Sequence, residues 1–160
     1  MTRTVWRIAA DTRDYPADDA SGRGAEVTGG RWNRKGTPML YSASSRALAC
    51  LETFVHLNSG GLPLNRYLVG IEIDDALWDA AQVESEASLS VGWDAEPASL
   101  TSVDFGTGWA KSGASLLLIV PSVIVPEEAN ILINPRHPDA GRITPRKVRK
   151  WQYDPRLTRG

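Results

Sequence analysis

Short runs with strand-like patterns recur along the chain, and their irregular order is the feature that most constrains the fold. Residues 115–120 (S-L-L-L-I-V) form the most apolar run, and residues 66–73 end with apolar side chains at alternate positions. Further strand candidates lie at residues 4–9, 38–42, 122–125, 129–133 and 147–153. Helix-like spacing occurs at residues 45–58 and 99–111, and residues 74–97 carry weak signals for short pieces. Because strands and helices do not alternate regularly, the pattern predicts an α+β fold with a mixed β-sheet core and a few helices.

A chain of 160 residues is long enough for one compact core, so we expect a single domain spanning residues 1–160. The sequence contains neither an apolar run long enough to cross a membrane nor a secretory signal pattern, which predicts a cytoplasmic protein without membrane contact. A net charge of −1 argues against nucleic acid as the main target of the whole surface. The last twenty residues are nevertheless basic, which fits a solvated edge strand or contact with an acidic partner or nucleic acid.

The helix predicted at residues 45–58 combines a core-facing stripe with a carboxylate. Ser44 or Ser45 can cap its start, and Gly60 and Gly61 can close it. Glu52 lies on the flank of the apolar stripe, where a carboxylate is held in place yet can be reached by a ligand, although periodicity alone favours an ordinary exposed glutamate of the helix. The stripe itself is predicted to consist of Ala47, Leu48, Leu51, Phe54 and Val55, with Cys50 as a small buried residue.

Residues 29–52 concentrate more polar chemistry than any other segment, and they read G-G-R-W-N-R-K-G-T-P-M-L-Y-S-A-S-S-R-A-L-A-C-L-E. The segment follows a polar, glycine-rich stretch at residues 11–30, which we expect to be a long surface loop. It then supplies Arg31 from the loop, Tyr41 from a strand and Glu52 from a helix. We expect these three side chains to converge on one cleft.

Several common kinds of site are not supported by the sequence. Gly22 and Gly24 lack the third glycine of a dinucleotide-binding turn, and Lys35-Gly36 has the wrong order for a phosphate-binding loop. One cysteine and two separated histidines give no metal-ligand cluster, so no metal is expected. A serine or cysteine triad is equally weak, because no G-x-S-x-G motif occurs.

A cation, a phenol and a carboxylate then remain, and together they suit cleavage of the N-glycosidic bond of NAD. Arginine can hold pyrophosphate through paired N–H donors, and an aromatic ring can stack on a planar group. A carboxylate beside a ribose can stabilise an oxocarbenium-like transition state. The set therefore suggests NAD as a substrate, and no separate cofactor is expected.

Two separated motifs resemble the RES-domain family, the toxin halves of RES/Xre toxin–antitoxin pairs. They are the segment at 29–52 and the run V-P-S-V-I-V-P-E-E-A-N-I-L-I-N-P-R-H-P at 120–138, and the resemblance covers nearly the whole chain. The arginine, glutamate and serine that name the family correspond to Arg31, Glu52 and Ser122, and Tyr41 matches a position in the family's NAD pocket. One departure is Asp139-Ala140-Gly141, where many relatives place an aromatic residue after H-P-D.

The resemblance implies a fold similar to the ADP-ribosyltransferases and degradation of cellular NAD by hydrolysis or phosphorolysis. An alternative is transfer of ADP-ribose to a protein target. The partner implied is an Xre-family helix-turn-helix antitoxin, through which any contact with DNA would be made. A carboxylate of that antitoxin could occupy the phosphate position at Arg31 and so inhibit the toxin in competition with NAD.

Some roles stay open at the level of sequence. Ser122 can satisfy backbone groups of a turn or contact the ligand, and the resemblance favours the ligand. Trp32 and Asn33 are assigned to substrate binding, although they could equally anchor the loop, and His56 reads as a structural neighbour. A different class of function is a non-enzymatic module that binds NAD, ADP-ribose or nucleic acid. A nuclease is the weaker version of that alternative.

Overall fold

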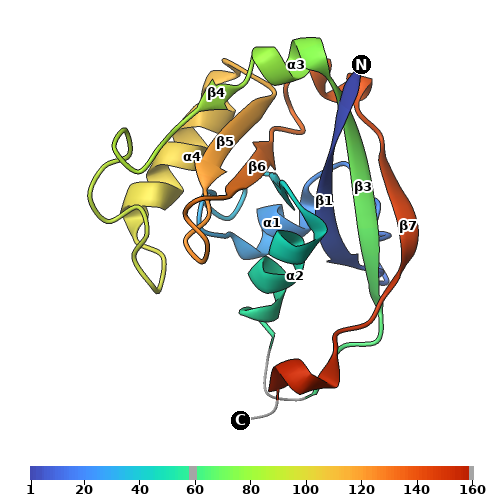
Figure 1. Ribbon diagram of the computed structural model, residues 1–160. Helices are drawn as coiled ribbons and strands as arrows, with labels where there is room; N and C mark the ends of the chain where they lie inside the picture. Colours follow the sequence, from blue (N-terminus) through green and yellow to red (C-terminus); the bar gives the residue numbers. More distant parts are fainter. Residues whose placement is uncertain (58–60, 159–160) are drawn as a thin grey trace.

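The computed structural model describes residues 1–57 and 61–158, which form an α+β structure, as predicted (Figure 1). In chain order the strands are β1 (Thr2–Ala10), β2 (Leu40–Ala43), β3 (Arg66–Asp74), β4 (Gln82–Val83), β5 (Leu117–Pro121), β6 (Ala129–Ile133) and β7 (Pro145–Trp151). The α-helices are α1 (Arg23–Thr28), α2 (Arg46–Phe54), α3 (Asp75–Asp79) and α4 (Leu100–Ser112). Short 3-10 helices span Pro138–Arg142 and Pro155–Thr158.

The seven strands form one mixed sheet in the order β4-β5-β6-β2-β1-β3-β7. The pair β4 and β5 is parallel, and the other neighbours are antiparallel. β1 pairs with β3 along its whole length, whereas it meets β2 only at Trp6 and Ala43. The sheet therefore consists of two halves, β4-β5-β6-β2 and β1-β3-β7. They are joined where Trp6 pairs with Ala43, and β1 and β2 diverge from each other beyond that pair (Figure 1).

We call the face of the sheet that carries Val5 and Ile71 the inner face, and the opposite face the outer face. One core cluster lies on the inner face, and two lie on the outer face. The inner cluster joins both halves, since it includes Val5 and Ile71 from one and Leu117 and Ile131 from the other. On the outer face, α4 and the loops beside it cover β5 and β6. α2 packs on the outer face near β1 and β2, where Leu48 is buried. Within the described residues, no helix is long and apolar enough to cross a membrane.

Side chains at the helix starts explain where α2, α3 and α4 begin. The hydroxyl of Ser45 accepts a hydrogen bond from the Leu48 N–H, so the predicted serine cap of α2 is confirmed. Asp74 and Ser99 cap α3 and α4 in the same way. At the far end of α4, Gly113 has φ of 66°, the left-handed conformation that commonly terminates helices.

The edges of the sheet agree with the sequence pattern. β7 lies at the edge of the sheet, in keeping with the solvated edge strand suggested for the basic last residues, and it begins at Pro145 rather than at residue 147. α3 and β4 are the short pieces expected within residues 74–97.

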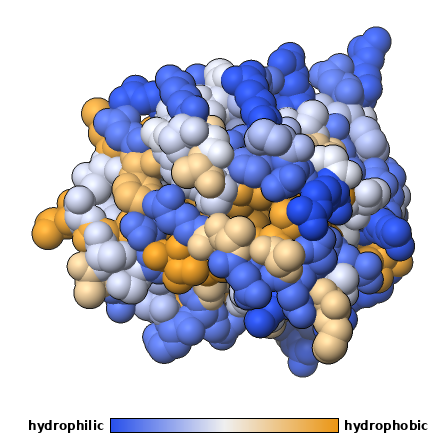
Figure 2. All heavy atoms as spheres, turned by 90° about the horizontal axis from the view of Figure 1, so that it is seen from above, coloured by the Kyte–Doolittle hydropathy of each residue, from blue (hydrophilic) through white to orange (hydrophobic). Residues whose placement is uncertain are grey.

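Viewed from the end that carries α3, the surface is mostly hydrophilic, with hydrophobic residues in small groups (Figure 2).

Three predictions of secondary structure are wrong. The stretch at 11–30 is not only a loop, because residues 23–28 form α1. Residues 122–125 form a turn instead of a strand, because the Ser122 hydroxyl accepts hydrogen bonds from the N–H groups of Ile124 and Val125. α2 ends at Phe54 rather than near residue 58, and Asn58 and Gly60, named for that helix end, lie outside the described residues.

The buried face of α2 also differs from the predicted stripe. Leu48 and Ala49 are buried, whereas Ala47, Leu51 and Val55 are exposed. The helix instead turns Glu52 and Thr53 inward, where both side chains find hydrogen-bond partners. Cys50 is only partly buried, against the core cluster that contains Leu48 and Ala49, and burial raises the pKa of its thiol.

Candidate active site

Glu52 is held by two neutral donors that act on the same carboxylate oxygen. The Ser122 hydroxyl donates to Oε1 over 2.6 Å, and the Asn130 side-chain amide donates to Oε1 over 2.8 Å. Within the described residues, no hydrogen bond reaches Oε2. The carboxylate is thus fixed in orientation while one oxygen is left for a ligand, which is the arrangement needed to stabilise a nearby positive centre.

Ser122 owes its position to the turn between β5 and β6. Its side chain is fully buried, and its N–H donates to the Glu128 carbonyl over 2.9 Å. Its hydroxyl oxygen accepts two backbone N–H groups of the turn, so the hydroxyl proton points to Glu52. Ser122 therefore satisfies the turn and orients the carboxylate at once, and its predicted contact with substrate stays a prediction.

Asn130 is the member of this cluster that the sequence analysis missed. It lies on β6 directly opposite Ala43 of β2, in a run of otherwise apolar residues. The signal that could have revealed it is an asparagine within an apolar strand, because a polar side chain packed in the structure needs a hydrogen-bond partner. Its partner is Glu52 of α2.

Arg31 belongs to a second cluster, in which it is tied to the loop before α4. One of its terminal nitrogens donates to the carbonyls of Trp93 and Ala95, over 3.3 and 2.7 Å. The other pairs with the Glu96 carboxylate over 2.8 Å. The Glu96 side chain is 75% exposed, whereas that of Arg31 is 18% exposed. Arg31 thus already holds an anionic group, and this group sits at the surface.

Tyr41 fixes the loop that carries Arg31. Its hydroxyl donates to the Asn33 side-chain carbonyl over 2.6 Å and accepts the Trp32 N–H over 3.0 Å. Burial raises the pKa of the Tyr41 phenol well above its ordinary value, so the phenol stays protonated as a donor. A side chain at Gly30 would lie 2.6 Å from this hydroxyl, which is why the loop needs glycine there.

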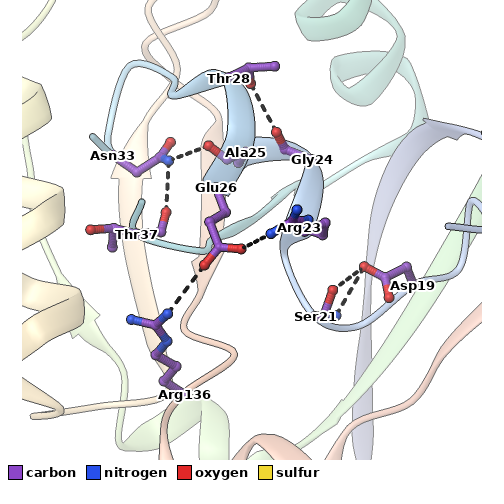
Figure 3. Close-up of polar contacts among 10 residues, drawn as sticks. All are labelled: Asp19, Ser21, Arg23, Gly24, Ala25, Glu26, Thr28, Asn33, Thr37 and Arg136. Carbon is purple, nitrogen blue, oxygen red and sulfur yellow. Dashed lines mark hydrogen bonds and ion pairs between the residues drawn. The ribbon is translucent and has the colours of Figure 1, made fainter. Parts of the chain in front are cut away.

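Trp32 and Asn33 point into the structure. The Asn33 amide donates to the carbonyls of Ala25 in α1 and of Thr37, over 2.8 and 3.0 Å (Figure 3). Trp32 packs in the cluster under α4, stacked against Trp93 with ring centroids 6.3 Å apart. This geometry supports the anchoring role for both residues, and their predicted contact with substrate stays a prediction.

α4 approaches the same loop so closely that one position must be glycine. A Cβ at Gly106 would lie 1.9 Å from the carbonyl oxygen of Trp32. One residue on, the Thr107 hydroxyl accepts the Arg34 N–H over 2.9 Å, and Asp104 pairs with the Arg34 side chain. The Arg31 loop is therefore clamped between Tyr41 on one side and α4 on the other.

The two clusters face the same side of the sheet, although no hydrogen bond joins them within the described residues. Tyr41 lies opposite Leu132, and Asn130 lies two residues before Leu132 on the same strand. Such diagonal neighbours on one face have Cβ atoms roughly 7–8 Å apart. The structure thus brings Tyr41 and the Glu52 cluster onto one face, with the Arg31 loop bound to the Tyr41 hydroxyl.

A partly buried arginine supports the strand that carries Tyr41. Arg7 of β1 donates to the Tyr41 carbonyl over 3.1 Å, beside the junction where β1 and β2 part. Burial lowers the pKa of this guanidinium. The described residues contain no group of three or more metal-binding side chains, and His56 is exposed.

Comparison with known proteins identifies the family of this chain. The RES domain model matches residues 4–156. A Prs ADP-ribosylating toxin from Sphingobium is 64% identical over 159 residues, which cover 99% of each chain. Toxin Res of Yersinia enterocolitica is 40% identical over 146 residues, 91% of this chain and 94% of its own. Toxin Res of Pseudomonas putida is 38% identical over 138 residues, 85% of this chain and 87% of its own. The chain therefore belongs to the RES-domain family of toxins.

Proposed function

We propose that this toxin cleaves the nicotinamide N-glycosidic bond of NAD and transfers the ADP-ribosyl group to a protein. The observation that carries the proposal is the Glu52 carboxylate, which Ser122 and Asn130 hold through one oxygen while the other is left for a ligand. The 64% identical relative is named for ADP-ribosylation of Prs, so the same class of reaction is the first expectation for this chain.

In the first step, the bond between C1′ of the ribose and the nicotinamide nitrogen breaks, and the electron pair leaves with nicotinamide. The leaving group departs neutral because the bound nicotinamide ring is cationic. C1′ and the ring oxygen then share a positive charge, which the fixed carboxylate of Glu52 stabilises. In the second step, a lone pair of the acceptor forms the new bond to C1′, and the acceptor's proton passes to Glu52 or to solvent.

Arg31 would hold the pyrophosphate of NAD. To do so, the phosphate oxygens would replace the Glu96 carboxylate, while the carbonyls of Trp93 and Ala95 keep the guanidinium in place. The phenol of Tyr41 is used within the loop, so its ring is the part that can stack on the ligand.

The acceptor separates this proposal from hydrolysis and phosphorolysis, the reactions first expected from the sequence. Water and phosphate need no docking surface, whereas a protein acceptor does. The name of the Sphingobium relative favours a protein and makes Prs the acceptor to test first.

An antitoxin partner follows from the same proposal, because an unrestrained NAD-consuming enzyme would harm its own cytoplasm. We take an Xre-type helix-turn-helix protein as that partner and the cytoplasm as the site of action. An antitoxin carboxylate placed on Arg31 would take the position that Glu96 holds in the free chain. Inhibition would then be competitive with NAD.

Release of nicotinamide from NAD tests the reaction. Glu52→Gln nearly preserves the side-chain shape and removes the charge, so we expect release to fall at least about 100-fold with the fold intact. Glu127→Gln, an exposed position in the turn after β5, serves as the matched control and should retain wild-type release. Full activity of Glu52→Gln would overturn the assigned role. No release by the wild-type protein would favour a binding module.

A further inference from the structure

A groove lies on the outer face of the half-sheet β1-β3-β7, outside the cluster around Glu52. It is an open hollow with a volume of about 280 Å³, and its lining includes Trp6, Gly70, Glu72, Arg142, Arg146 and Val148. Gly70 forms the floor, since a Cβ there would lie 3.2 Å from the Trp6 ring and 3.4 Å from the Val148 side chain. α2 covers the neighbouring part of this face, where Ile8 and Leu68 are buried.

The strand register connects this groove to the carboxylate cluster. Asn130 lies opposite Ala43, Ala43 opposite Trp6, Trp6 opposite Gly70, and Gly70 opposite Arg146. These residues therefore form one row on one face of the sheet. Because neighbouring strands lie about 4.8 Å apart, Trp6 at the start of the groove is roughly 10 Å from the strand position of Asn130.

Unpaired positive charge gathers beside the groove. The Arg46 guanidinium of α2 stacks over the Trp6 ring, 4.0 Å from its centroid, and Arg149 stacks over Trp151. Within the described residues, Arg46, Arg146 and Arg149 form no ion pair, so these cations are not neutralised by the chain itself. Arg142 differs, because Asp74 pairs with it over 2.9 Å.

One carboxylate in the lining opposes this charge. Glu72 is exposed, forms no recorded ion pair within the described residues, and lies opposite Thr4 in the register. An anionic segment in the groove would thus be attracted at the end formed by Trp6 and Arg146 and repelled at the end formed by Glu72.

We infer that this groove seats an acidic segment of the protein that accepts ADP-ribose. The inference rests on the proposed function, and it adds where the acceptor binds and which charge recognises it. The row from Asn130 to Arg146 places the groove about two strand spacings from the carboxylate cluster, with Ala43 buried under α2 between them, so a segment bound in the groove lies beside the site. Water or phosphate as acceptor would have no use for this surface.

Two substitutions of opposite sign test the inference. Arg146→Glu should raise the KM for the acceptor roughly tenfold, because it places a negative charge where the segment docks. Glu72→Gln should lower that KM severalfold, because it removes the repelling carboxylate. Lys111→Glu, an exposed residue of α4 on the other half-sheet, makes the same charge change as Arg146→Glu and should leave the KM unchanged.

The assay uses purified Prs and NAD labelled in the adenine ring, with nicotinamide release and labelling of Prs followed in parallel. When Prs is absent, water accepts the ADP-ribosyl group, and all three variants should release nicotinamide and free ADP-ribose at the wild-type rate, which shows that they are folded and cleave NAD. The difference in Prs labelling between Arg146→Glu and wild type should shrink as salt is raised.

Equal labelling by wild type, Arg146→Glu and Glu72→Gln would overturn the inference, as would weaker labelling by both variants. Release of nicotinamide by the wild type with no labelling of Prs would also overturn it, while leaving NAD cleavage in place. Absence of nicotinamide release from the wild type would refute the proposed function itself.

Discussion

Two glycines of α4 should respond in opposite directions to the same substitution. Gly106 faces the Arg31 loop, and an added Cβ would lie 1.9 Å from the Trp32 carbonyl oxygen and 2.8 Å from its carbon. Gly108 is exposed, and nothing lies within 4 Å of an added Cβ. Neither glycine has a positive φ, so alanine fits the helical backbone at both positions.

The magnitudes follow from packing and helix propensity. Gly106→Ala would meet the carbonyl oxygen, the carbonyl carbon and the Cβ of Trp32, at 1.9 to 2.8 Å, so α4 or the loop must retreat by about 1 Å, at a cost of about 1–3 kcal/mol for overpacking. Gly108→Ala should instead stabilise the protein by about 1 kcal/mol, since alanine is the better helix former. The helix-propensity gain applies at both positions, so the two variants should differ by the overpacking cost of roughly 1–3 kcal/mol, which corresponds to a Tm difference of about 2–12 °C for a domain of this size.

Urea unfolding of the two variants and the wild type measures this difference, and nicotinamide release reports the position of the loop. Gly106→Ala should lower both the stability and the activity, because the displaced loop carries Arg31. Gly108→Ala should raise the stability and retain the activity. If Gly106→Ala matched Gly108→Ala in stability, the close approach of α4 to Trp32 would be wrong.

Three further outcomes can be measured on the same preparations. Asn130→Ala should lower kcat for nicotinamide release about tenfold or more with little change in KM, since one charge-assisted hydrogen bond to the reactive carboxylate is worth about 1.5–3 kcal/mol. Glu96→Gln should lower the KM for NAD, because it weakens the group that competes for Arg31; an increased KM would show that Glu96 instead helps to bind the substrate. The hydrogen bond from Lys147 holds the pKa of the Asp11 carboxyl below its usual range. The pair therefore stabilises the fold at pH values above the unfolded pKa of about 4. This stabilisation is lost as the pH falls through the lower pKa of the folded state. The urea midpoints of Asp11→Asn and wild type should therefore differ at pH 7 and converge below about pH 4, and a difference that persists in acid would contradict this pairing.

Strands were the most predictable part of the fold, because apolar alternation reports directly on packing. The runs around residues 66–73 and 129–133 correspond closely to β3 and β6. The divided sheet could not be predicted, since it depends on β2 leaving β1 after the single pair of Trp6 and Ala43. The sequence pattern does not indicate that β1 pairs with β2 at one residue and with β3 at nine residues.

The buried face of α2 shows why periodicity alone failed at the site. Leu51 is 36% exposed and Val55 is 55% exposed, although both belong to the predicted stripe. Glu52 and Thr53 turn inward because distant residues satisfy them, with Thr53 bonded to the Tyr153 hydroxyl over 2.6 Å. Partners 70 and 100 residues away in the chain leave no local signal, and burial of polar groups is acceptable only when they are present.

Within the candidate site, the resemblance identified Glu52 and Ser122, and the structure joins them by a direct hydrogen bond. It also named Arg31 and Tyr41, which belong to one clamped loop. The sequence could not reveal that Glu96 already holds Arg31, because a loop more than sixty residues away supplies that carboxylate. The groove beside Trp6 was equally hidden, because it is formed by side chains of three different strands.

The mass of the products formed from NAD and purified Prs tests the central claim most directly. If the Glu52 site cleaves NAD and delivers the ADP-ribosyl group to a protein, Prs should gain the mass of one or more ADP-ribosyl groups, and at least one nicotinamide should appear for each group gained. Glu52→Gln should give neither product. Unmodified Prs together with free or phosphorylated ADP-ribose would contradict transfer to this protein and identify water or phosphate as the acceptor. Unchanged NAD would contradict the assignment of the site altogether.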